Sequence, residues 1–180
     1  MAAYLVAGAG LVALVTISLF MWVGGLWGPL NDLSLLVMTL ALGPLMLAFW
    51  ELGGLTPAPL ALAAQVSGWI AVLIWCAVQV LMIVGVVDFD YHTGAVGPFA
   101  VEAVALVVIG LWIGGANLLA GPWLNWNRWL GVVSGIGFVI FAIGLLLGGV
   151  DHPLTYVGGI GYQLVFPIWA FLMGRRLAAR

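Results

Sequence analysis

The stretch WLGVVSGIGFVIFAIGLLLGG, residues 129–149, decides the fold class of this chain. It contains no charged side chain, and Arg128 and Asp151 stand just outside it. An α-helix rises about 1.5 Å per residue, so about 20 apolar residues cross a hydrocarbon core of about 30 Å. Because the bilayer interior offers no water to the backbone amides, a helix is the structure expected for such a segment. The stretch therefore predicts a membrane-spanning helix.

The whole chain shares this apolar character. Of its 180 residues, 66% are hydrophobic and 6% are charged, whereas about 25% are charged in a typical globular domain. This composition predicts an integral membrane protein with no separate soluble domain. A net charge of −2 gives no electrostatic basis for binding nucleic acid. A single cysteine, Cys76, cannot form an intramolecular disulfide.

Apolar runs bounded by Gly, Pro, Asn and Asp predict six transmembrane helices. The predicted spans are residues 3–23, 33–51, 60–87, 99–119, 129–149 and 155–174. The first run is too long for a signal peptide and has no basic flank, so we expect it to be a retained helix. The fold class predicted is an all-α, polytopic membrane bundle, a single domain over residues 1–180. Small residues four apart, such as Ala3/Ala7, Gly110/Gly114 and Gly131/Gly135, are expected to let helices pack closely.

The arginines predict the orientation of the bundle. Arg128 lies between the fourth and fifth spans, and Arg175, Arg176 and Arg180 follow the sixth. With six spans these positions lie on one side of the membrane. Cytoplasmic loops are enriched in Lys and Arg, so this side, with both termini, is expected to be cytoplasmic. Except for Glu51, the acids and both histidines then lie at or near the outer end.

Six titratable side chains form a candidate polar cluster on the outer face: Asp88, Asp90, His92, Glu102, Asp151 and His152. Carboxylates and imidazoles bind Zn²⁺ and act as general acids and bases, so a metal or catalytic site is one hypothesis. The candidate metal ligands are Asp90, His92, Asp151 and His152. Water-facing loops also carry such residues without any site, and the spacing matches no strong metal motif.

Two further acids have local interpretations. Asp32 precedes the predicted second helix, where it is expected to cap the first backbone amides and to meet the positive end of the helix dipole. Glu102 lies one turn inside the fourth helix. It either gains from the dipole of that helix or serves a functional site, as ionisable groups inside membranes often do.

Within the bilayer, the candidate ligand-lining residues are Gln79, Gln163, Trp75 and Trp112. The two glutamines are predicted at matching depth, where their amides either bond each other or line a cavity. The two tryptophans are predicted in the membrane interior at similar depth. The other eight are expected at the interfaces: Trp22 and Trp27 outside, and Trp50, Trp69, Trp123, Trp126, Trp129 and Trp169 inside.

Two prolines are predicted to kink their helices near the midplane of the membrane. Pro44 falls in the second span and Pro167 in the sixth, and each removes an amide donor from its helix. A kink at Pro167 would free the backbone carbonyl of Gln163. Interrupted helices at this depth bind substrates in transporters, but proline also occurs in membrane spans for purely structural reasons.

Short motifs along the chain carry a resemblance. They are Trp27-Gly28-Pro29-Leu30-Asn31-Asp32, Gly43-Pro44, Leu130-Gly131, and Phe166-Pro167-Ile168-Trp169 followed by Gly174-Arg175-Arg176-Leu177. Together they resemble small bacterial six-helix integral membrane proteins of unknown function. The resemblance implies a location in the bacterial cytoplasmic (inner) membrane. It transfers no catalytic residue, because such families have no established activity.

The sequence leaves three functional hypotheses open. It contains no phosphate-binding loop, His-Glu-x-x-His motif, cysteine pair or Gly-x-Ser-x-Gly motif, and it specifies no cofactor. The first hypothesis is a membrane protein that binds a small or lipid-like ligand, or a membrane subunit of a complex or transporter. The second is a membrane enzyme or metal-binding protein that uses the outer acids and histidines. The third is a structural scaffold. At 19.0 kDa the chain is small for a solitary transporter, so we expect a homo-oligomer or a partner membrane subunit.

Overall fold

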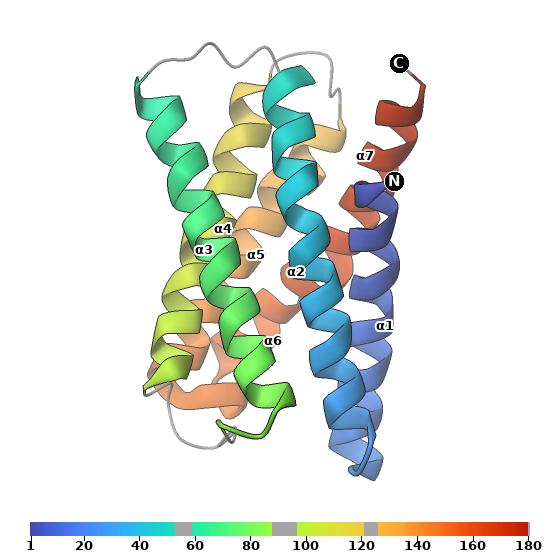
Figure 1. Ribbon diagram of the computed structural model, residues 1–180, viewed down its shortest axis with the longest axis vertical. Helices are drawn as coiled ribbons and strands as arrows, with labels where there is room; N and C mark the ends of the chain where they lie inside the picture. The colour runs from blue at the N-terminus through green and yellow to red at the C-terminus, as the bar shows by residue number, and fades with distance from the viewer. Residues whose placement is uncertain (53–58, 88–96, 121–125, 180) are drawn as a thin grey trace.

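A computed structural model describes residues 1–52, 59–87, 97–120 and 126–179. In these ranges it contains six helical spans that are long and apolar enough to cross a membrane (Figure 1). The prediction of an all-α, polytopic bundle is therefore confirmed. Six such spans indicate a multi-pass membrane protein.

Five spans are single helices, and the sixth is composite. The single helices are α1 (Ala2–Val23), α2 (Trp27–Leu52), α3 (Pro59–Ile83), α4 (Pro98–Leu119) and α5 (Asn127–Gly148). The sixth span consists of the 3₁₀ turn η2 (Gly149–Asp151), α6 (Pro153–Gly159), the π-helical segment η3 (Ile160–Val165) and α7 (Phe166–Ala178).

Helix α2 begins at Trp27 rather than at residue 33, which corrects one prediction. Gly24 and Gly25, with φ of 71° and 67°, turn the chain immediately after α1, because glycine adopts positive φ without steric cost. Pro29 then falls in the first turn of α2, where a missing amide removes no helical hydrogen bond. Asp32 consequently lies within α2 instead of capping it.

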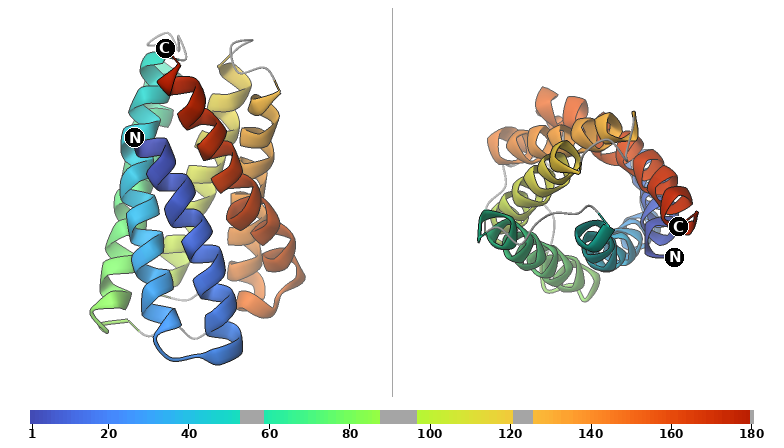
Figure 2. Two further views of the ribbon diagram at one scale, coloured as in Figure 1. Left: turned by 90° about the vertical axis from the view of Figure 1, so that its right-hand side faces the viewer. Right: turned by 90° about the horizontal axis from the view of Figure 1, so that it is seen from above.

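The spans form a closed ring in the order of the sequence. Each of α1 to α4 packs against the next helix along the chain, α5 packs against the sixth span, and α7 returns to α1. Viewed along the bundle, the ribbons surround a common axis (Figure 2). Large side chains fill this interior, and six of them are at most 7% exposed: Phe49, Trp75, Trp112, Phe138, Phe166 and Trp169.

Close backbone contacts hold α4, α5 and the sixth span together. A Cβ atom added at Gly110 of α4 would lie 2.6 Å from the carbonyl oxygen of Gly135 in α5, and one added at Gly137 would lie 2.5 Å from the Cα atom of Gly161 in η3. Side chains at these positions would force the helices apart. The predicted packing role of small residues is therefore observed at Gly110 and Gly135.

Pro167 lies just after a segment in which the backbone hydrogen bonds are π-helical instead of α-helical. The backbone N–H of Phe166 donates to the carbonyl of Gly161, five residues earlier, at the end of the π-helical segment. Pro167, the second residue of α7, has no amide to donate. A π-helical segment is an ordinary accommodation of such a defect and is frequent at functional sites. Helix α2, in contrast, continues through Pro44 as one helix.

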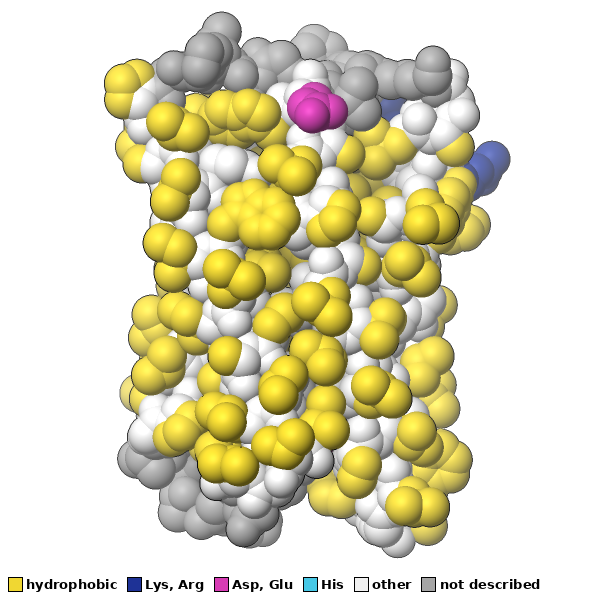
Figure 3. Space-filling view, viewed as in Figure 1, with side chains coloured by type: hydrophobic (Ala, Val, Ile, Leu, Met, Phe, Trp, Pro, Cys, Tyr) yellow, Lys and Arg dark blue, Asp and Glu magenta, His cyan; other side chains and the backbone are white. Residues whose placement is uncertain are grey.

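Charged and apolar side chains occupy different parts of the surface. Apolar side chains cover the visible sides of the described bundle, and an acidic and a basic group lie near its upper end (Figure 3). Glu51 is exposed at the end of α2, Arg128 lies at the start of α5, and Arg175 and Arg176 lie in the last turns of α7. We call this the arginine end. It also carries both termini (Figure 1).

Candidate functional site

A buried acid lies near the end of the bundle opposite the arginines. Glu102 is the fifth residue of α4, and its side chain is 8% exposed. Gln79 lies one turn before the end of α3 and is 1% exposed. Because α3 and α4 are antiparallel neighbours, these positions face each other, and the Nε2 atom of Gln79 donates to the Oε1 atom of Glu102 over 2.9 Å.

The hydrogen bonding of this site is incomplete. The Oε1 atom of Gln79 and the Nε1 atom of Trp75 are buried and have no hydrogen-bond partner among the described residues. The Trp75 indole lies close to the Glu102 carboxyl group, although without the geometry of a hydrogen bond. A buried polar atom without a partner costs about 1–3 kcal/mol. The site therefore holds one acceptor and one donor that a ligand can satisfy.

No positive side chain of the described residues neutralises Glu102. Arg128, Arg175 and Arg176 belong to the opposite end of the bundle. An isolated carboxylate is strongly disfavoured in a low-dielectric interior. Glu102 is therefore suited to bind a proton or a positively charged group.

Aromatic rings form one side of the site. Trp75 of α3 packs against Phe138 of α5 and Tyr162 of η3, with ring centroids 6.1 Å apart in both pairs. Phe138 and Tyr162 meet edge to face at 4.7 Å. The charge of Glu102 also acts on Tyr162, which places the two side chains in the same region. We call Trp75, Gln79, Glu102 and Tyr162 the Glu102 site.

A second layer of buried polar groups lies closer to the arginine end. The indole N–H of Trp112 donates to Gln65 over 2.9 Å, and that of Trp169 donates to Asn117 over 3.1 Å. Gln65 precedes Gln79 by 14 residues in α3, which is about 21 Å along the helix. The Nε2 atom of Gln65 also has no hydrogen-bond partner among the described residues.

This second layer corrects two predictions about tryptophan. Trp169 is fully buried in the ring instead of being exposed as an interfacial anchor, because its N–H is bonded to Asn117 inside the ring. Trp75 and Trp112 are both buried, as predicted, but they do not share one level. Trp112 bonds to Gln65, ten residues before Trp75 in α3, and this separation is about 15 Å along the helix.

The remaining predicted site residues do not join the Glu102 site in the described structure. Gln163 is half-buried in η3, and Gln79 bonds to Glu102 instead of to Gln163. Asp151 is exposed in η2. His152 caps α6, because its Nδ1 atom accepts a hydrogen bond from the backbone N–H of Leu154 over 3.3 Å.

The metal hypothesis concerns residues that the structure describes only in part. Asp88, Asp90 and His92 lie outside the described residues. Within the described ranges, no three or more His, Cys, Asp or Glu side chains are grouped so that they could hold a metal ion.

Several residues of the interior were missed by sequence reasoning. Gln65, Asn117 and Tyr162 are buried polar side chains that lie in the core of the ring. The available signal was a polar residue inside an apolar run, the same signal that selected Gln79. This signal does not identify buried residues, because burial in the ring depends on which helix face is turned inward.

The comparisons with known proteins give no relative for this chain, since no family model, curated protein or solved structure matches it.

Proposed function

We propose that this protein is a membrane-embedded binding protein whose helical ring takes a small amphiphilic amine at the Glu102 site. The observation that carries the proposal is a buried carboxylate with one amide partner and no cationic partner among the described residues. An ammonium group supplies both the missing positive charge and the missing hydrogen-bond donors. The proposal narrows the broader expectation of a small or lipid-like ligand to one chemical class.

The surrounding groups are suited to such a ligand. The ammonium donates to Glu102 and to the unpartnered Oε1 atom of Gln79. A cation over an aromatic face gains about 0.5–2 kcal/mol, and the aromatic rings of the site, Trp75 and Tyr162, have centroids 6.1 Å apart. The apolar body of the ligand packs against the neighbouring rings, including Phe138.

The ligand enters from the end of the bundle at which α3 ends and α4 begins, because Glu102 is the fifth residue of α4. The arginines at the opposite end support an outward-facing entrance, by the enrichment of basic residues on the cytoplasmic side. The membrane in question, by the resemblance described above, is the bacterial cytoplasmic membrane.

The test is a binding measurement on the full chain in lipid nanodiscs. The probe is hexylamine, its neutral analogue is hexanol, and empty nanodiscs correct for partition into lipid. Saturable binding of hexylamine but not of hexanol is expected from the native protein. Glu102→Gln should weaken hexylamine binding at least tenfold, which corresponds to about 1.4 kcal/mol.

The matched control is Glu51→Gln, because Glu51 is an exposed acid at the arginine end. This variant should bind hexylamine as the native protein does. Gln79→Met, which removes the unpartnered acceptor and keeps the charge of Glu102, should give an intermediate loss. Equal binding of hexylamine by Glu102→Gln and the native protein would overturn the proposal, provided that far-UV circular dichroism shows both to be folded.

A further inference from the structure

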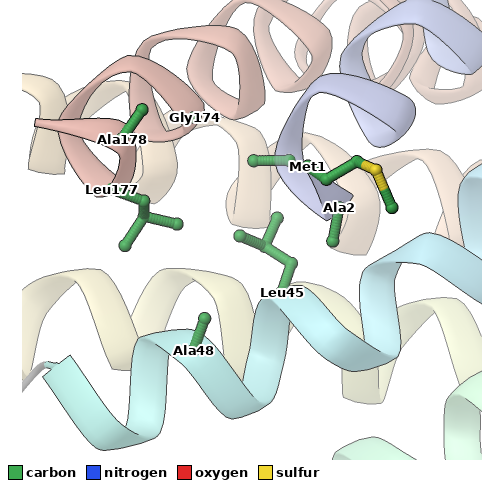
Figure 4. Close-up of a pocket in the computed structure, with 8 residues that line it drawn as sticks. Met1, Ala2, Leu45, Ala48, Gly174, Leu177 and Ala178 are labelled. Atoms are coloured by element: carbon green, nitrogen blue, oxygen red, sulfur yellow. The ribbon is translucent and has the colours of Figure 1, made fainter.

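We infer that a second site, at the arginine end of the bundle, binds the acyl chain of an anionic phospholipid. A pocket of about 220 Å³ opens there between α1, α2 and α7. Met1 and the first residues of α1 line it on one side, Leu45 and Ala48 line it from α2, and Gly174, Leu177 and Ala178 line it from α7 (Figure 4). This site is independent of the proposed amine binding, since Glu102 lies near the other end of the bundle.

The lining of the pocket fits hydrocarbon. Its side chains are those of Met, Ala and Leu, together with the bare backbone of Gly174. Ala48 of α2 and Ala178 of α7 line the pocket with small side chains, which leaves room between these two helices. Burial of apolar surface gains about 25 cal/mol per Å², and the last turns of membrane-spanning helices lie where lipid chains meet their head groups.

The charges beside the pocket fit a phosphate. Arg175 is exposed and directly follows Gly174, and it lies about 60° around the helix from Ala178 at 3.6 residues per turn. A guanidinium group binds phosphate through paired hydrogen bonds. Among the described residues, the arginine end carries three arginines and one acid, Glu51. This balance favours an anionic head group over a zwitterionic one.

The direct test is native mass spectrometry of the delipidated protein in detergent. The protein is incubated with dioleoyl phosphatidylglycerol or with dioleoyl phosphatidylcholine at equal concentration. We expect one phosphatidylglycerol molecule to be retained at least five times more often than phosphatidylcholine. Inorganic phosphate alone should neither be retained nor compete, because without an acyl chain it has no contact with the pocket.

Two kinds of variant separate the contributions of the acyl chain and of the head group to lipid retention. Ala48→Phe fills the pocket and should reduce lipid retention at least fivefold, whereas Ala77→Phe, on an exposed position of α3, should not. Arg175→Gln should remove the preference for phosphatidylglycerol, and Arg128→Gln, on a helix that does not line the pocket, should keep it.

Either of two results would overturn the inference. One is equal retention of the two lipids by the native protein, and the other is full retention by Ala48→Phe. If Ala48→Phe does not fold, Ala178→Leu tests the same point, since Ala178 lines the pocket in the last turn of α7.

Discussion

Replacing Gly110 by alanine tests the close packing of α4 on α5. The added Cβ atom would lie 2.6 Å from the carbonyl oxygen of Gly135 and 2.8 Å from the Cβ atom of Phe138. Gly114 lies one turn later in α4, and its added Cβ atom would meet no closer atom than the Cα atom of Gly135, at 3.9 Å. The two glycines therefore form a matched pair on one helix face.

Two opposing effects set the difference in stability between Gly110→Ala and Gly114→Ala. Alanine favours a helix over glycine by about 1 kcal/mol, and this gain is common to both variants. Overpacking of a close contact costs about 1–3 kcal/mol and applies to Gly110→Ala alone, because a backbone oxygen cannot rotate away. Gly110→Ala should therefore be about 1–3 kcal/mol less stable than Gly114→Ala.

The assay is thermal unfolding in dodecylmaltoside, followed by far-UV circular dichroism. At about 2–4 °C per kcal/mol for a chain of this size, the two midpoints should differ by about 2–12 °C, with Gly114→Ala at or above the native protein. An equal or higher midpoint for Gly110→Ala would show that α4 and α5 are not in backbone contact and would refute the packing described here.

Two other predictions concern the second polar layer and the orientation. Trp112→Phe removes the N–H that donates to the Oε1 atom of Gln65 and leaves this buried oxygen without a partner. The free energy of unfolding, measured by the same assay, should fall by about 0.6–2 kcal/mol. In a Cys76→Ala background, a membrane-impermeant maleimide applied to intact cells should label Asp151→Cys and not Arg175→Cys; the reverse pattern would contradict an outward-facing Glu102 site.

The location of Glu102 was predictable, and its partner was not. Its distance from Gly97-Pro98 placed it one turn inside the predicted fourth helix, and it is the fifth residue of α4. For Gln79 the sequence left open a bond to Gln163 or a place in a cavity lining, on the ground of similar depth alone. Two residues at equal depth are in contact only if their helices are neighbours. Helix α3 packs against α4, and this packing brings Glu102 opposite Gln79.

The errors at Asp32 and Trp169 have the same origin. Asp32 was assigned to a helix start, and Trp169 to the membrane interface, from the position of each residue along the chain. Gly24 and Gly25 allow α2 to begin early, which puts Asp32 inside the helix. Trp169 is turned into the ring, where Asn117 accepts its N–H. Position along a span gives depth, whereas the inward or outward direction comes from neighbouring helices.

The sequence by itself determined the class, the number of spans and their approximate limits. It did so because a backbone in hydrocarbon must satisfy its amides internally, so that each apolar run of about 20 residues becomes a helix whatever surrounds it. Only the tertiary structure decided that the spans close into a ring, that Glu102 bonds to Gln79 inside it, and that Trp75 packs against Tyr162. The helices are apolar on nearly every side, so composition does not mark the face that turns inward. That face is selected by side-chain shape, by glycine contacts such as that of Gly110 with Gly135, and by a few interhelical hydrogen bonds.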